Sequence, residues 1–348
     1  MIQENDNTQK SRHLASIQQI VDLQPIENAD SIELARCLGW NTVIKRGQFK
    51  IGDLVIFFEI DCVLPKTPTF EFLKDKHYKI KTCRLRGAVS QGLCMPLSIL
   101  PPGEYKVGDD VTEILGVTKY EKPIPVQLRG RVRGNFPRGI PKTEELRVQS
   151  IPDVVQKYQG YTFTRTEKAN GTSATYFLDE DTGLHCCSRN LDLAPEIVHP
   201  FNGTAYWQIA DKMNIEEIIK TLGKDVVLQG EIIGNGINGN QYKLNDIQFK
   251  IFNLYDKKNH VYFDQHVLND TIEGFGFPKS WFVPYLGEIT LDHNVDQLVE
   301  MAYGKSLINP DVIREGLVFR VSPEVIDPFV GRVSWKVISP NFNLEFKE

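Results

Sequence analysis

Several strand-like runs in the second half of this 348-residue chain each carry a charged side chain among apolar neighbours. They span Val226–Glu231, Phe249–Leu254, Arg314–Phe319 and Ser334–Val337. A lone charge on a buried strand is costly unless it meets a partner. The pattern therefore predicts strands whose charges converge on one pocket, and such a pocket would hold an anion and a metal.

Lys168 lies between two further strand-like runs, one at 160–166 and one at 172–178. It should therefore stand near a turn, and Gly171 would let a substrate approach the backbone closely. A lysine in such a place can act as a covalent nucleophile once its ammonium loses a proton. For residues 168–171 alone, a surface hairpin with no chemistry is the alternative.

The composition is that of an ordinary globular protein, with 41% hydrophobic and 24% charged residues. The length predicts two domains of roughly 150 residues each. The net charge is −5, so the chain as a whole is not a basic nucleic-acid binder. Any surface that binds nucleic acid must be a local basic patch.

The six cysteines include no Cys-x-x-Cys pair and have no histidine at zinc-finger spacing. They are therefore expected to be reduced structural residues in a cytosol-like compartment. Residues 1–12 lack the apolar core of a signal peptide. No apolar run reaches the roughly 18 residues that span a bilayer. We therefore expect a cytoplasmic protein with no membrane partner.

Residues 1–125 are predicted to form a small β domain, because short strand-like runs alternate there with turn residues. An OB-like barrel is one option for this domain. Its stretch 74–86 is rich in Lys and Arg, includes Arg84 and Arg86, and contains Tyr78. Such a stretch suits a nucleic-acid face if the aromatic ring is exposed, and a solvated charged loop is the alternative.

Residues 126–142 are predicted to form a basic linker. They are dense in Gly and Pro and carry five positive charges with no acidic residue: Arg129, Arg131, Arg133, Arg138 and Lys142. The segment could track phosphates or could simply be a soluble connection. Residues 143–348 then mix strands with helices near 215–222 and 295–303, which predicts an α+β domain with mostly antiparallel strands.

The run Gly234–Gly239 fits the Gly-x-Gly-x-x-Gly pattern of dinucleotide-binding sites. That pattern must open a helix to bind pyrophosphate, and the residues that follow are strand-like instead. The run is therefore interpreted as a glycine-rich hairpin loop near the active site.

Taken in order, these runs resemble the motifs of the covalent nucleotidyltransferase superfamily of ligases and capping enzymes. Motif I would be Lys168-x-Asn170-Gly171, and motif III would be Gly230-Glu231. Motifs IIIa, IV and V would be 249–254, Glu315-Gly316-x-Val318 and Lys336. With a small β domain in front, the layout resembles the ATP-dependent RNA ligases of the Deinococcus/Naegleria type.

That resemblance implies an N-terminal OB-type β-barrel followed by an antiparallel-sheet, ATP-grasp-like nucleotidyltransferase domain. The catalytic residues it implies are Lys168, Lys336 and Arg147. The nucleotide site it implies consists of Glu167, Glu231, Phe252, Val318, Lys336, Arg147 and Gln149. Here Glu231 would bind the ribose, while Phe252 and Val318 would sandwich the adenine.

The resemblance also implies Mg²⁺ or Mn²⁺ as the metal, held through water by Glu315 with help from Asn170. The RNA contacts it implies are Arg189, Ser188, Arg84 and Arg86. Two positions depart from the family pattern. Asn170 stands where the family often has Asp, and Ile338 stands where relatives often have a second lysine.

The implied reaction seals 3′-hydroxyl and 5′-phosphate RNA ends through lysyl-AMP and RNA-adenylate intermediates. This fits RNA repair by a monomer, with a nicked duplex as the substrate. One alternative is an ATP-dependent DNA-end joiner. Another is a non-catalytic RNA-binding protein with a decayed nucleotidyltransferase core.

Overall fold

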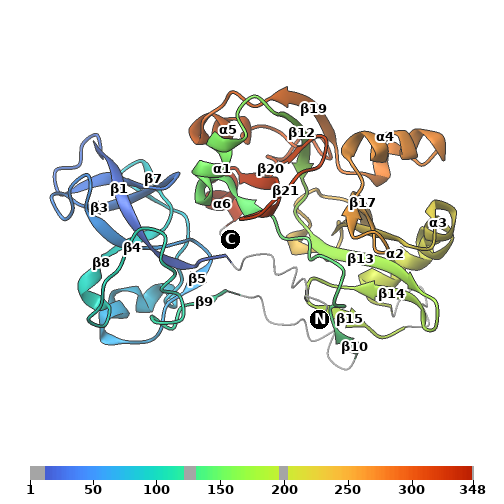
Figure 1. Ribbon diagram of the computed structural model, residues 1–348, viewed down its shortest axis with the longest axis horizontal. Helices are drawn as coiled ribbons and strands as arrows, with labels where there is room; N and C mark the ends of the chain where they lie inside the picture. The colour runs from blue at the N-terminus through green and yellow to red at the C-terminus, as the bar shows by residue number, and fades with distance from the viewer. Residues whose placement is uncertain (1–11, 121–130, 196–202, 347–348) are drawn as a thin grey trace.

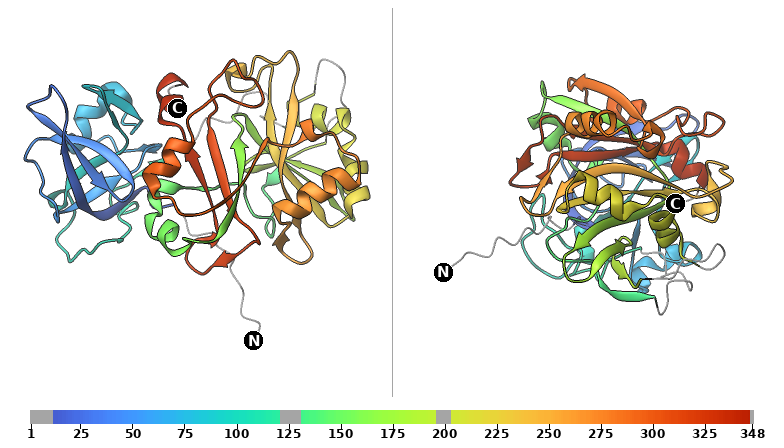
Figure 2. Two further views of the ribbon diagram at one scale, coloured as in Figure 1. Left: turned by 90° about the horizontal axis from the view of Figure 1, so that it is seen from above. Right: turned by 90° about the vertical axis from the view of Figure 1, so that its right-hand side faces the viewer.

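The computed structural model describes residues 12–120, 131–195 and 203–346. The strands of the N-terminal part form one lobe, and the rest of the described chain forms a larger lobe beside it (Figures 1 and 2). Each lobe has its own hydrophobic core. We call them the N-terminal lobe and the C-terminal lobe.

The N-terminal lobe is built on a five-stranded antiparallel sheet in the order β3-β2-β1-β4-β8. The bounds are β1 Ala15–Pro25, β2 Ile32–Cys37, β3 Trp40–Lys45, β4 Leu54–Phe58 and β8 Leu93–Pro96. Strand β1 pairs with β4 through its first half and with β2 through its second, and its register shifts at Val21. Such a bulge bends a strand, and it lets β1 turn the corner of the lobe.

Short elements complete this lobe. Strand β5 (Cys62–Val63) pairs with β9 (Thr118–Lys119), and β6 (Cys83–Leu85) pairs with β7 (Ala88–Ser90). The 3₁₀ helices are η1 (Pro68–Lys76) and η2 (Leu97–Ile99). A nucleic-acid face at 74–86 would use an exposed Tyr78, but this residue is buried and its hydroxyl donates to Glu71 at 2.9 Å. The ring is therefore unavailable for stacking on a base.

The C-terminal lobe contains a seven-stranded antiparallel sheet in the order β10-β15-β14-β13-β16-β17-β18. The bounds are β10 Val132–Asn135, β13 Thr172–Asp179, β14 Gly183–Cys187, β15 Leu191–Leu193, β16 Val226–Ile233, β17 Gln248–Asp256 and β18 Val261–Tyr262. Helices α2 (Ala205–Lys212), α3 (Ile215–Leu222) and α4 (Gln265–Gly274) share one apolar cluster with it. Helix α3 directs Ile215, Ile218 and Ile219 into this cluster at helical spacing.

A five-stranded sheet in the order β11-β23-β20-β12-β19 forms the other half of the C-terminal lobe. Its bounds are β11 Leu146–Arg147, β12 Thr162–Lys168, β19 Tyr285–Thr290, β20 Gly316–Val321 and β23 Ser334–Ile338. Nearby lie α1 Pro152–Lys157, α5 Val295–Met301, α6 Pro340–Phe346, η4 Val148–Ser150, η5 Asn238–Asn240, η6 Lys279–Trp281, and the paired strands β21 Ile326–Asp327 and β22 Gly331–Arg332. Every residue of β20 is buried, as expected for a central strand covered on both faces.

The turn predicted after Lys168 exists, but the two strands around it are not a hairpin. Strand β12, which ends at Lys168, belongs to the five-stranded sheet, whereas β13 begins at Thr172 in the seven-stranded sheet. Residues 169–171 therefore cross from one sheet to the other. This crossing places Lys168 at the junction of the two sheets.

The structure also describes the predicted linker, the glycine-rich run, the cysteines and the helix lengths. Part of the predicted linker, Val132–Asn135, is strand β10 and pairs with β15, while Arg129 lies outside the described residues. The run Gly234–Gly239 joins the antiparallel strands β16 and β17 as a loop, which confirms that it does not open an α-helix. All six cysteines are free. Across the described ranges, we find no helix long and apolar enough to cross a membrane.

The two lobes meet tightly at Gly39, where the turn between β2 and β3 reaches the C-terminal lobe. Its N–H donates to the Gln149 carbonyl at 2.9 Å. A Cβ atom at Gly39 would lie 2.7 Å from Val295 Cγ1 and 2.9 Å from Gln149 Cα. Arg36 adds an ion pair across the same contact, 2.6 Å from Asp296.

We predict that Gly39→Ala destabilises the protein by about 1–3 kcal/mol, because the added methyl group overpacks this contact. The matched control is Gly134→Ala, where an added Cβ meets nothing within 4 Å. Thermal unfolding of both variants tests the prediction. Equal melting temperatures for Gly39→Ala and wild type would show that the two lobes do not pack as described.

Candidate active site

Strand register gathers the predicted catalytic residues on one face of the five-stranded sheet. Arg147 pairs with Lys336, Lys336 with Val318, and Val318 with Thr166. Directly paired residues project from the same face, and so do residues two positions apart on one strand. Lys168, two residues after Thr166, therefore projects from the same face as Arg147, Lys336 and Val318.

Lys168 forms an ion pair with Glu315. Its Nζ lies 2.8 Å from Oε1 and 2.9 Å from Oε2 of that carboxylate. The segment before Glu315 is fixed by Arg314, which donates to carbonyls at the end of α5, including Met301 O at 2.6 Å. A Cβ at the following Gly316 would lie 2.0 Å from Val337 O. Only glycine fits there, which explains the Glu-Gly pair of the motif.

Glu231 lies across the junction on β16, in register with Ser173. It accepts a hydrogen bond from the Gly171 N–H, and a Cβ at Gly171 would lie 2.1 Å from Ile232 O. The surrounding protein raises the pKa of the Glu231 carboxyl to about 7 by desolvation, although Lys168 opposes the shift. The motif glycine thus allows the Lys168 turn to pack directly on the Glu231 strand.

Lys336 and Arg147 form a pair of neighbouring cations, of which Arg147 is buried and Lys336 is half-buried. Burial, helped by the charges of Arg147 and Lys168, lowers the pKa of Lys336 to about 7. Arg147 is 8% exposed, and its Nε and Nη1 have no hydrogen-bond partner among the described residues. Buried donors without acceptors fit an anionic ligand that supplies oxygen atoms.

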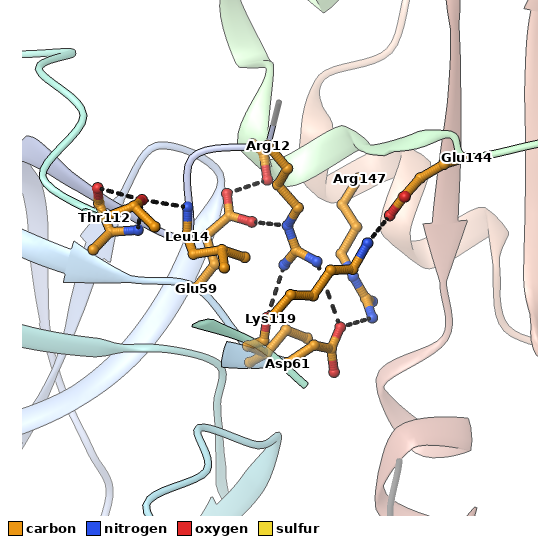
Figure 3. Close-up of polar contacts among 11 residues, drawn as sticks. Arg12, Leu14, Glu59, Asp61, Thr112, Lys119, Glu144 and Arg147 are labelled. Atoms are coloured by element: carbon orange, nitrogen blue, oxygen red, sulfur yellow. Dashed lines mark hydrogen bonds and ion pairs between the residues drawn. The ribbon is translucent and has the colours of Figure 1, made fainter. Parts of the chain in front are cut away.

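The remaining donor of Arg147 reaches into the N-terminal lobe (Figure 3). Its Nη2 lies 2.8 Å from Asp61 Oδ2, and Arg12 also approaches this carboxylate, at 3.7 Å. Burial alone would raise the pKa of Asp61, but Arg147 and Arg12 outweigh it and lower the pKa. Glu59 accepts hydrogen bonds from Arg12 and from Ser150 of the C-terminal lobe, both at 2.5 Å.

Arg189, a predicted RNA contact, pairs with Glu144 at 2.8 Å. Lys119 of the N-terminal lobe binds the same carboxylate (Figure 3). Burial would raise the pKa of Glu144, but Arg189 and Lys119 outweigh this effect and lower it to about 2. Asp61 and Glu144 were not predicted from the sequence as site residues. Each of these carboxylates pairs with residues that are distant in the sequence, so no local sequence pattern marks Asp61 or Glu144.

The other predicted nucleotide-site residues are placed as follows. Glu167 is buried and accepts from Ser306 Oγ at 2.5 Å and from the Leu307 N–H at 2.7 Å. Gln149 is buried beside Arg147, at the Gly39 contact. Phe252 is the extra residue of a β-bulge, because Gln229 pairs with Asn253 and Gly230 with Ile251.

The remaining predicted RNA contacts are divided between the lobes. Arg84 and Arg86 are both exposed on the β6–β7 hairpin, where Arg84 donates to the Gly87 carbonyl at 3.0 Å. Ser188 is buried and bonds to the Leu191 carbonyl at 3.3 Å. The hairpin residues are free to meet a large ligand, whereas Ser188 shapes the turn that presents Arg189.

No cluster of three or more His, Cys, Asp or Glu side chains in the described part of the chain forms a ready-made metal site. Mg²⁺ is often held by one or two carboxylates, with waters and substrate phosphates completing its shell. Glu315 beside Lys168, together with the unpaired donors of Arg147, fits a metal that arrives with a phosphate ligand. Asn170 already accepts a hydrogen bond from Asn238 Nδ2 at 3.1 Å.

Comparison with known proteins agrees with this geometry. A family model described as RNA ligase matches residues 162–338, and one described as an OB-fold domain matches residues 14–97. A search of curated proteins found no match. The chain belongs to the RNA ligase family, and the predicted α+β architecture of an OB-fold domain followed by a ligase domain is confirmed.

Among solved structures, the chain is similar to Naegleria gruberi RNA ligase with PPi. The two are 36% identical over 95% of this chain and 98% of that one, with a TM-score of 0.83. It is also similar to a mutant of that ligase with ATP and Mn, at 35% identity over 97% of this chain and all of the other, with a TM-score of 0.84. A mutant with AMP and Mn gives 35% identity over 95% and 98%, again with a TM-score of 0.84.

We predict that Glu231→Gln stabilises the metal-free protein at pH 8 by about 1–3 kcal/mol, and that the gain vanishes near pH 4.5. The folded-state pKa of Glu231 is raised, so its contribution to stability is full below the unfolded value and is lost as pH rises through about 7. A glutamine side chain does not ionise, so the Glu231→Gln variant does not lose this stability as the pH rises. Chemical denaturation at both pH values measures the difference.

The matched control for this experiment is Glu27→Gln, which removes an exposed carboxylate from the N-terminal lobe. Its effect on stability should be small and equal at both pH values. If Glu231→Gln gave no gain at pH 8, the carboxylate would not be desolvated as described.

Proposed function

We propose that this protein is an ATP-dependent RNA ligase that joins 3′-hydroxyl and 5′-phosphate ends through lysyl-AMP and RNA-adenylate intermediates. The observation that carries the proposal is the placement of Lys168 beside Glu315, on the sheet face that also bears Lys336 and Arg147. Solved structures of the similar Naegleria ligase with ATP and Mn support the choice of nucleotide and metal.

In the first step, Lys168 Nζ attacks the α-phosphate of ATP. A nitrogen–phosphorus bond forms and the bond to pyrophosphate breaks, but the ammonium must first lose its proton. Glu315 stabilises the ammonium while the two are paired, whereas Lys336 and Arg147 disfavour it. A divalent cation, Mg²⁺ or Mn²⁺, would neutralise charge on the phosphates when bound near Glu315 and Asn170.

The proposed nucleotide site uses the unpaired donors of Arg147 and the charge of Lys336 for the phosphates. Glu231 would accept hydrogen bonds from the ribose, and its raised pKa does not prevent this role near neutral pH. Phe252 and Val318 would enclose the adenine, with Gln149 and Glu167 completing the site. The bonds from Glu167 to Ser306 and Leu307 support a role in holding the loop before Glu315.

In the second step, AMP moves from Lys168 to the RNA 5′-phosphate, and in the third the 3′-hydroxyl displaces AMP. We propose that Arg189 binds the 5′-phosphate after leaving Glu144, with Ser188 shaping its turn. Arg84 and Arg86 would contact the RNA backbone. A nicked duplex bound by a monomer during cytoplasmic RNA repair fits these contacts, and the six free cysteines fit a reducing compartment.

We also propose a division of the chain into an OB domain at 1–125, a basic linker at 126–142 and an adenylyltransferase domain at 143–348. The linker would then supply the edge strand β10 to the second domain. In the described part of the linker, strand β10 pairs with β15, and the Phe136 N–H donates to the Asn190 carbonyl, next to Arg189. The positive charges within residues 131–142 therefore favour a path for RNA near Arg189.

The first functional prediction is that wild type becomes labelled by ATP radioactive at the α-phosphate, and that Lys168→Ala does not. The reason is that Lys168 supplies the bonding nitrogen. Denaturing electrophoresis reads the label, and Lys258→Ala, an exposed lysine, is the control that should label normally. If folded wild type never took up label yet bound RNA, the non-catalytic alternative would replace the ligase.

The second functional prediction concerns the metal and the substrate. Chelation with EDTA should abolish labelling, and Mg²⁺ or Mn²⁺ should restore it, because the phosphates need charge neutralisation. Pre-labelled protein should then seal an all-RNA nick faster than an all-DNA nick of the same sequence. Faster sealing of DNA would favour a DNA-end joiner.

A further inference from the structure

A chain of side-chain amides runs beside Lys168, and its two ends are backbone carbonyls. Gln241 Nε2 donates to the Ile313 carbonyl at 2.8 Å, and Asn170 Nδ2 donates to Gln241 Oε1 at 2.9 Å. Asn238 Nδ2 then donates to Asn170 Oδ1 at 3.1 Å and also to the Gly171 carbonyl. We call these three amides the amide relay.

The direction of the relay is fixed at both ends, because a backbone carbonyl only accepts hydrogen bonds. The Ile313 carbonyl can accept only from the NH₂ group of Gln241, so the side-chain oxygen of Gln241 must face Asn170. The Gly171 carbonyl can accept only from the NH₂ group of Asn238, and this same NH₂ group also donates to Asn170. Position 170 must therefore donate on one side and accept on the other.

An amide meets both requirements, and an ionised carboxylate does not. An aspartate at position 170 would direct an oxygen at Gln241 Oε1, which cannot turn away without losing Ile313. Asn170 and Gln241 are both buried, at 8% and 7% exposure, so water would not readily replace the lost bond.

We propose that Gln241 is a positioning residue that makes position 170 an obligate amide. The relay joins the turn after Lys168 to the glycine-rich loop and to the segment that ends at Glu315. Tyr242, next to Gln241, strengthens this link by accepting the Asn170 N–H at 2.9 Å. The relay thereby holds the Lys168 turn and the Glu315 segment in one arrangement, without adding negative charge beside Lys168.

The proposal deepens the proposed function, and its effect on adduct formation rests on that function. Its effect on stability does not, because hydrogen-bond direction is independent of what the site catalyses. A test that reads stability and labelling separately can therefore distinguish failure of the relay from failure of the ligase assignment.

The test compares the melting temperatures of metal-free wild type and Asn170→Asp at pH 8. We expect Asn170→Asp to melt lower by roughly 2–5 °C, the size of a lost buried hydrogen bond. The loss arises because the carboxylate directs an oxygen at Gln241 Oε1 and can no longer donate to it.

Two further variants complete the test. Asn28→Asp adds the same charge at an exposed turn and should melt like wild type. Gln241→Met removes the opposing oxygen, so Asn170→Asp should cost less in that background than in wild type. This comparison decides the question even if Asn170→Asp alone folds poorly.

The relay would be overturned if Asn170→Asp matched wild type, or if its penalty were as large in the Gln241→Met background as in wild type. Labelling by ATP is measured on the same samples at a temperature where all are folded. The positioning role predicts that Gln241→Met and Asn170→Asp form the lysine adduct more slowly at saturating ATP. Unchanged labelling rates with the predicted melting behaviour would reduce the relay to a structural feature and overturn that role.

Discussion

The site depends on the register of three neighbouring strands, β12, β20 and β23. Pairing of Val318 with both Thr166 and Lys336 brings the ends of distant segments into one row. A slip of one residue would turn Lys336 and Val318 to the opposite face of the sheet. The register is held by the buried apolar residues that alternate with them and by Gly316, which has no room for a side chain.

The site also depends on an ion pair between the two lobes, formed by Arg147 and Asp61. Arg147 is a buried cation and Lys336 is a half-buried one, and the nearest compensation for Arg147 comes from Asp61 of the N-terminal lobe. Buried charges are tolerated when they are paired, and breaking such a pair is costly. The N-terminal lobe is thus tied to the proposed phosphate site. An anionic nucleotide would compete with Asp61 for the same guanidinium.

The motif runs could be located from the sequence because each places a charge or a glycine at a fixed point of a strand. Lys168, Glu231, Glu315 and Lys336 were predicted this way, and the glycines beside them proved to have no space for a Cβ. The sheet crossing after Lys168 could not be foreseen, since strand pairing over long separations leaves no local pattern. For the same reason the pairing of Arg147 and Arg189 with carboxylates was not predicted. The burial of Tyr78 could not be decided from the sequence, because a ring among charges can turn inward or outward.

The most direct test of the central claim is to map the site of AMP attachment. Wild type would be incubated with ATP and Mn²⁺, digested, and its peptides analysed by mass spectrometry. The arrangement of Lys168, Glu315 and Lys336 predicts AMP on the peptide that contains Lys168, at that lysine. Attachment at another residue, or no attachment to protein that is folded and metal-loaded, would contradict it.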